Sequence, residues 1–141
     1  MTPLLEASAE GGVEDLRALI DGGADLGETT ADGNNALWVA SASGSLEALQ
    51  TLIDAGVEID HRNPDGATAL IYAASAGKAE VVSLLLRHGA NPALETVDGF
   101  SALDLASTVE CLALLRKAQP RREVRASRSA DGAPSALSEM K

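Results

Sequence analysis

The sequence predicts an all-α solenoid made of stacked helix-turn-helix units with short β-turn or hairpin connections. The first observation is an Asp-Gly pair that recurs at a step of 33 residues, beginning at Asp32, Asp65 and Asp98. The second is that leucine and alanine recur at the same step, as at Leu37 and Leu70. A fixed period of this length is typical of repeat architectures, whose units bury their apolar faces only by stacking on one another.

Each unit can be derived in order from its residues. Glycine tolerates positive φ, so the Asp-Gly pair predicts a tight turn. The next element is a short helix, for example over residues 36–43, and Gly44 then lets the chain reverse. Its expected N-cap residues all carry side-chain oxygens that can accept from free amides of the first turn. They are Thr2, Asn35, Thr68 and Ser101.

A second helix is expected after the reversal. Its first turn carries Glu14, Glu47 or Glu80 in successive units, where a negative charge suits the helix dipole. A glycine in the left-handed conformation is expected to end it. The glycines at these positions are Gly23, Gly56 and Gly89.

The combination of motifs resembles the ankyrin repeat family. The motifs on which this resemblance rests are Thr-Pro-Leu at 2–4, Asp-Gly-Ala-Thr-Ala-Leu at 65–70 and Gly-Ala-Asn at 89–91. The resemblance implies an ankyrin repeat domain over residues 1–118, and the composition of residues 119–141 predicts a disordered basic tail. The units of the domain are expected at about 1–31, 32–64, 65–97 and 98–118.

The sequence departs from the family pattern in several ways, among them Ala36, Ala69 and Ala102 in place of the family's proline in the later units. The histidine that follows Thr-Pro-Leu in the family is replaced by Leu5, Trp38, Ile71 and Asp104. We therefore expect the side-chain bond that this histidine makes back to the turn to be missing. The fourth unit lacks three residues and the glycine between its helices, which indicates a compact C-terminal cap.

Charge is distributed unevenly along the chain. The net charge is −10, with four basic and 18 acidic residues in 1–115 but seven basic and three acidic residues in 116–141. An acidic body repels phosphate backbones, so nucleic acid is not an expected ligand of the folded part. The expected partner is another protein with a neutral or basic surface, and the uneven end units favour a monomer.

The expected location is the cytoplasm. The sequence has no leader-like segment after Met1 and no apolar stretch of membrane-spanning length. A single cysteine, Cys111, has no partner for an internal disulfide or a thiolate metal site, which suits a reducing compartment.

The residue types that enzymes and metal sites need are sparse. The two histidines, His61 and His88, do not repeat with the units, and we expect both to be exposed polar residues. The turn aspartates are about one repeat apart, too far to share a cation. The sequence therefore predicts no catalytic, cofactor-binding or metal-binding residues and no enzyme activity.

The resemblance implies that a partner binds the concave face formed by turn tips and first helices. The tip residues carried over are Ala31, Asp32, Asn34, Pro64, Asp65, Ala67, Val97, Asp98 and Phe100. The first-helix residues are Ala9, Glu10, Ala42, Ser43, Ser75 and Ala76, with Trp38 near the mouth of the groove. Small helix residues predict a smooth floor against which bulky side chains of a partner can lie.

The aromatic residues admit alternatives. Phe100 either anchors a partner or folds back over the cap. Trp38 is either partly buried in the stack or part of the binding surface. Tyr72 is expected in the core.

The sequence favours an adaptor or regulatory subunit that recognises one protein through the concave face. The alternative is an inhibitor or immunity-type protein that blocks a basic target enzyme. A third hypothesis is nucleic-acid contact through the basic tail, which carries four closely spaced arginines, Arg121, Arg122, Arg125 and Arg128.

Overall fold

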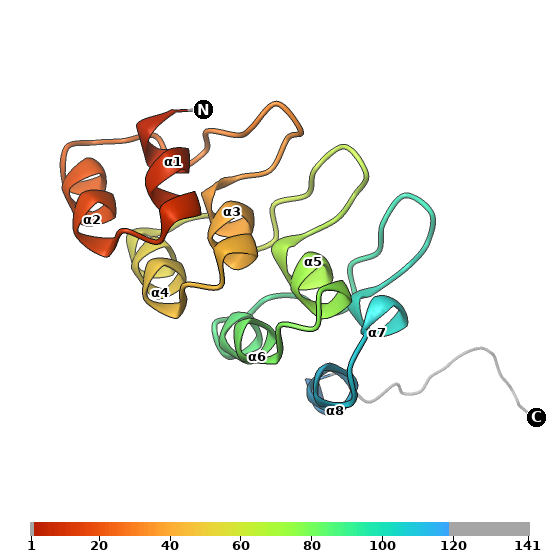
Figure 1. The fold of residues 1–141 in the computed structure, drawn as a ribbon. Coiled ribbons are helices and arrows are strands. Elements are labelled where there is room, and N and C mark those ends of the chain that lie inside the picture. Colours follow the sequence, from red (N-terminus) through yellow and green to blue (C-terminus); the bar gives the residue numbers. More distant parts are fainter. Residues whose placement is uncertain (1, 119–141) are drawn as a thin grey trace, which may run out of the picture.

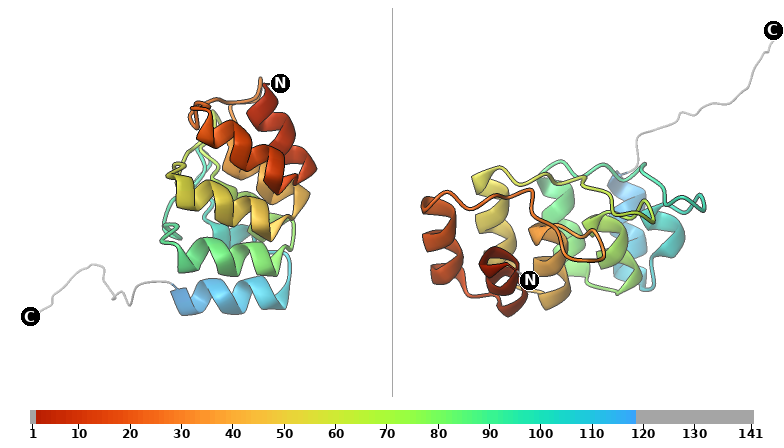
Figure 2. Two further views of the ribbon diagram at one scale, coloured as in Figure 1. Left: turned by 90° about the vertical axis from the view of Figure 1, so that its left-hand side faces the viewer. Right: turned by 90° about the horizontal axis from the view of Figure 1, so that it is seen from above.

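The computed structural model describes residues 2–118, which form eight helices arranged in two rows (Figure 1). The helices are α1 (Pro3–Glu10), α2 (Val13–Asp21), α3 (Ala36–Ser43), α4 (Leu46–Ala55), α5 (Ala69–Ser75), α6 (Ala79–Arg87), α7 (Ala102–Leu105) and α8 (Val109–Ala118). Helices α1, α3, α5 and α7 form one row and pack on their neighbours in it, and α2, α4, α6 and α8 form the other (Figure 2). The predicted all-α solenoid is confirmed. The predicted tail lies outside the described residues.

The first helix of each unit begins where the sequence predicts. Asn35 Oδ1 accepts from the amide of Trp38 at 3.1 Å, and Thr68 Oγ1 accepts from the amide of Ile71 at 3.2 Å. Thr2 caps α1 in the same way. Each cap satisfies one amide that has no partner within the helix, which fixes the point where the loop turns into helix.

The fourth unit is shortened at its first helix. Helix α7 spans a single turn. Two residues after it, the amide of Ser107 donates to the carbonyl oxygen of Ala74 on α5 at 3.1 Å. The histidine bond to the turn is absent here, but another side chain bonds back to the start of the helix. Asp104, which stands in place of the family's histidine, accepts from the Ser101 amide at 2.9 Å while Ser101 Oγ accepts from the Asp104 amide at 3.3 Å. This capping box compensates for the short helix.

The second helices end near the predicted glycines. Gly56 adopts φ 100° directly after α4, and its amide donates to carbonyl oxygens of the last turn. A residue with a Cβ would be strained in this conformation.

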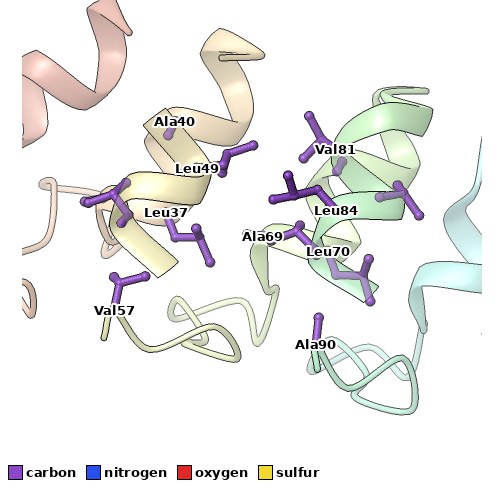
Figure 3. Packing of buried hydrophobic residues seen from close by; sticks show 14 of the residues in the cluster. Leu37, Ala40, Leu49, Val57, Ala69, Leu70, Val81, Leu84 and Ala90 are labelled. Carbon is purple, nitrogen blue, oxygen red and sulfur yellow. The ribbon is translucent and has the colours of Figure 1, made fainter. Parts of the chain in front are cut away.

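The core runs continuously between the two rows. Leu37 on α3 and Leu70 on α5 occupy equivalent positions one repeat apart, and both are buried (Figure 3). Leu49 on α4 is fully buried, and Ala40 on α3 contributes a small side chain to the same cluster. Alanine at these positions lets adjacent helices approach closely, which explains how a chain with 2% aromatic residues fills its core. None of the helices in residues 2–118 combines the length and apolar character needed to cross a bilayer.

Candidate protein-binding face

Three long loops connect the units and project on one side of the first-helix row (Figure 1). They are loop 1 (residues 22–35), loop 2 (56–68) and loop 3 (88–101). The surface bordered by these loops and by the exposed sides of α1, α3 and α5 is called the inner face below. It corresponds to the concave face expected from the sequence.

Each loop tip is a small hydrogen-bonded ring. In loop 1 the Thr30 amide donates to the Asn34 carbonyl and the Gly33 amide to the Thr30 carbonyl, both at 2.9 Å. The same pattern recurs in loops 2 and 3. A side-chain oxygen at the first ring position also accepts backbone amides across each tip. These residues are Thr30, Asn63 and Thr96. Internal bonding of this kind holds the tips in a defined shape.

Neighbouring loops are joined by polar bonds. Asn63 Nδ2 donates to Asn34 Oδ1 at 3.0 Å and links loops 1 and 2. The Val97 amide donates to the Asp65 carbonyl at 2.9 Å and links loops 2 and 3. The loops therefore form one wall along the stack.

The expectation that the two histidines are exposed is wrong, because each is partly buried between repeats. His61 Nε2 lies 2.8 Å from the carbonyl oxygen of Gly33. Because a carbonyl oxygen only accepts, Nε2 carries the proton in this bond. His88 Nε2 lies 3.2 Å from Gln50 Oε1 on α4. His61 thus connects loop 2 to loop 1, and His88 connects the start of loop 3 to α4.

The predicted site residues divide by their exposure. Most of them lie exposed on the inner face or its rim, namely Ala31, Asp32, Pro64, Asp65, Val97, Asp98, Phe100, Ala42, Ser43, Ser75 and Ala76. Asn34 and Trp38 are partly buried. Ala67 requires a correction, because only 9% of it is exposed and its amide donates to Asn63 Oδ1 at 3.0 Å inside the tip. It supports the loop and offers no surface to a partner.

The main feature that sequence reasoning missed is the pairing of Trp38 with Tyr72. The two rings come from α3 and α5, their centroids are 5.2 Å apart and their planes are inclined by 35°. Both side chains remain partly exposed, so the expected core position of Tyr72 is wrong. The repeat register could have indicated that Tyr72 lies at the surface, because Tyr72 is equivalent to Glu6, which is exposed on α1.

The helix floor beside this pair offers little hydrogen bonding. Ser43 Oγ donates to the Ala40 carbonyl at 2.8 Å, and Ser75 Oγ donates to the Tyr72 carbonyl at 2.9 Å. These hydroxyl protons are used within their own helices, and the remaining floor residues, Ala42 and Ala76, are apolar. The floor therefore suits shape-complementary contact with apolar or planar groups.

The loop tips carry a row of carboxylates. Asp32, Asp65 and Asp98 are exposed on successive loops. Within residues 2–118 the one approach of a carboxylate to a potentially cationic side chain within 4 Å is that of Glu58 Oε1 to His61 Nδ1 at 3.9 Å, so no carboxylate of the row is ion-paired with this part of the chain. The described residues also contain no group of three or more potential metal-ligating side chains.

Comparison with known proteins agrees with this geometry. Residues 37–86, which span α3 to α6 apart from the first residue of α3 and the last residue of α6, match the family model described as ankyrin repeats (many copies). A search of the curated proteins found no match.

Proposed function

We propose, from the premise that this chain belongs to the ankyrin repeat family, that it binds a partner protein through its inner face. Ankyrin repeats generally mediate protein–protein interaction and are generally non-enzymatic modules. The finer proposal is that the chain acts as an adaptor or regulatory subunit for one protein.

The observation that carries the proposal is the aromatic pair beside the small-residue floor. Trp38 and Tyr72 are held together by their mutual stacking, so a partner does not need to order them on binding. Tryptophan and tyrosine are enriched among the residues that contribute most to binding at interfaces. The flat floor formed by Ala42, Ser75 and Ala76 leaves room beside the rings for a bulky side chain.

The chemistry of the partner follows from the rim. Three exposed carboxylates that form no ion pair within residues 2–118 favour a partner that presents lysine or arginine along the loop wall. Such complementarity accelerates association more than it deepens affinity. An arginine that crosses the rim can also lie over an aromatic face, where a cation is attracted by the ring.

The same surface supports the second candidate, an inhibitor that covers a basic site on an enzyme. The acidic row favours this candidate when the target enzyme is basic. Both candidates use the same surface, but only the inhibitor blocks the activity of its partner. Adding the purified chain to the identified partner and measuring the partner's activity distinguishes them. We place the interaction in the cytoplasm, since the single cysteine, Cys111, is buried and forms no disulfide.

Affinity capture from a lysate of the source cell, with three baits, tests the proposal. The baits are the unchanged chain, a variant with Asp65→Asn, Asp98→Asn and Tyr72→Ala, and a control with Glu14→Gln, Asp21→Asn and Asp54→Asn on the exposed outer helices. We expect one protein to be retained by the unchanged chain and the control and lost by the first variant. Retention of the same proteins by all three baits would contradict the use of the inner face.

A further inference from the structure

The C-terminal end of the loop wall is uncovered in residues 2–118. A Cβ added at Gly33 would lie 2.5 Å from Pro64 Cδ of the next loop, and one added at Gly66 would lie 2.9 Å from the Val97 amide. The equivalent position at Gly99 has no atom of the described residues within 4 Å. Loops 1 and 2 are thus each covered by their successor, whereas loop 3 has no successor among residues 2–118.

Apolar side chains are left exposed at this end. Phe100 is 48% exposed and Val97 is 70% exposed. The residues equivalent to Phe100 in loops 1 and 2 are Asn34, which bonds to Asn63, and the buried Ala67. In addition, the Asp65 carbonyl accepts from loop 3, while no backbone amide in residues 2–118 donates to the Asp98 carbonyl. Both the apolar surface and the free acceptor fit a further loop of the same kind.

The sequence after α8 repeats the Asp-Gly motif of these loops in register. Asp131-Gly132 follows Asp98-Gly99 by 33 residues, the same step that separates the earlier Asp-Gly pairs. Residues 128–133 read Arg-Ser-Ala-Asp-Gly-Ala, and residues 62–67 of loop 2 read Arg-Asn-Pro-Asp-Gly-Ala. Composition predicts a disordered basic tail here, and the motif becomes visible only when the repeat register is extended.

The matching residues have defined roles in loop 2. Arg62 Nε donates to the Gly66 carbonyl at 3.2 Å, and its Nη2 donates to the Glu95 carbonyl of loop 3. Asn63 supplies the side-chain oxygen that closes the tip. Arg128 and Ser129 occupy these two register positions, and the hydroxyl of Ser129 is the group that Thr30 and Thr96 use for the same purpose.

The connection to this segment also has a suitable length. The aspartates of loops 1, 2 and 3 follow the last residue of the preceding helix by 11, 10 and 11 residues, and Asp131 follows Ala118 by 13. Each loop departs from the end of a second helix, as loop 2 does from α4 (Figure 1). A chain leaving α8 therefore has the length needed to reach loop 3.

We propose that residues 128–133 dock on loop 3 as a fourth loop of the wall, with Ala130 against the Asp98–Gly99 turn and over Phe100. This inference does not depend on the identity of a partner or on the proposed function. Its consequence for binding is that Phe100 serves as a contact within the chain and is removed from the surface that a partner meets.

Intramolecular disulfide formation in the full chain tests the docking. The background carries Cys111→Ala, which removes the single native thiol, and the test variant adds Asp98→Cys and Ala130→Cys. The matched control adds Asp98→Cys and Ala126→Cys, whose thiol follows Ala118 by 8 residues, compared with 12 for position 130. Both variants are oxidised at low protein concentration with a glutathione buffer, and the products are quantified by mass spectrometry.

We expect the 98–130 disulfide to form on the order of tenfold faster than the 98–126 disulfide, because docking raises the effective concentration of one thiol and not the other. Adding Gly132→Val to the test variant should bring its rate down to that of the control, since valine disfavours the positive φ of the turn. Equal rates for the two pairs, or a rate insensitive to Gly132→Val, would overturn the proposal. Predominant disulfides between molecules would also overturn it and assign the uncovered end to a second copy of the chain.

Discussion

The indole ring of Trp38 and the phenol ring of Tyr72 stack across α3 and α5 with their centroids 5.2 Å apart. Trp38 is the one tryptophan of the chain, so its fluorescence reports on a single place in the molecule, the floor of the inner face. The stack therefore provides both a structural contact and a local probe.

Replacing Tyr72 with alanine should expose the indole and shift its emission to longer wavelength. The variant should also lose about 0.5–1.5 kcal/mol of stability from the aromatic contact, in addition to the loss of buried area. Emission spectra and urea unfolding measure the two effects. Tyr72→Phe is the control and should preserve both properties, because the phenol oxygen is not part of the stack. An unchanged spectrum in Tyr72→Ala would show that the rings are not in contact.

Removing the side chain of Asn63 should destabilise the stack more than removing that of Asn91. Asn63 donates to Asn34 and accepts two amides within its own tip, whereas Asn91 Oδ1 accepts one amide, that of Ala93, at 2.9 Å. At about 0.5–1.5 kcal/mol for each bond, Asn63→Ala should cost roughly 2–3 kcal/mol and Asn91→Ala about 1 kcal/mol. The free energy of unfolding in urea checks this order. Equal losses would mean that neither the bond between loops 1 and 2 nor the second amide bond in the tip contributes to stability.

Gly33→Ala should cost more stability than Gly56→Ala, although both glycines have positive φ. The left-handed conformation alone costs an alanine roughly 1–2 kcal/mol at either site. At Gly33 the new Cβ would also meet Pro64 Cδ at 2.5 Å, whereas nothing lies within 4 Å at Gly56. Loop 1 must therefore shift away from loop 2 in the first variant. Urea midpoints of the two variants measure the difference, and identical midpoints would contradict close contact between the loops.

The sequence was most informative about features that each unit repeats. The N-cap residues Asn35 and Thr68 and the closing Gly56 were predicted because their roles depend on bonds within a few residues. The turn-and-two-helix unit follows from these bonds together with the 33-residue step.

Features created between units were harder to predict. Ala67 is buried and His61 bonds to Gly33 because the neighbouring loops are offset along the stack, and no pattern within one unit fixes this offset. The Trp38–Tyr72 contact has the same origin, since residues at different register positions meet across two helices. Which exposed residues form the site is therefore only partly visible in the sequence.

The loop-tip carboxylates should govern how fast a basic partner associates. Changing Asp32, Asp65 and Asp98 to asparagine removes three exposed charges from one wall while leaving side chains of nearly equal size. We expect the association rate constant for the captured partner to fall about tenfold at low salt, with a smaller change in the dissociation rate. The faster association of the unchanged chain should disappear as ionic strength rises, because exposed charges are screened beyond about 8 Å at physiological salt. The control is Glu14→Gln, Asp21→Asn and Asp54→Asn, which removes three exposed charges from the outer helices. If surface plasmon resonance gives the same association rate for both triple variants, net charge rather than the loop wall steers the partner, because the two variants carry the same total charge.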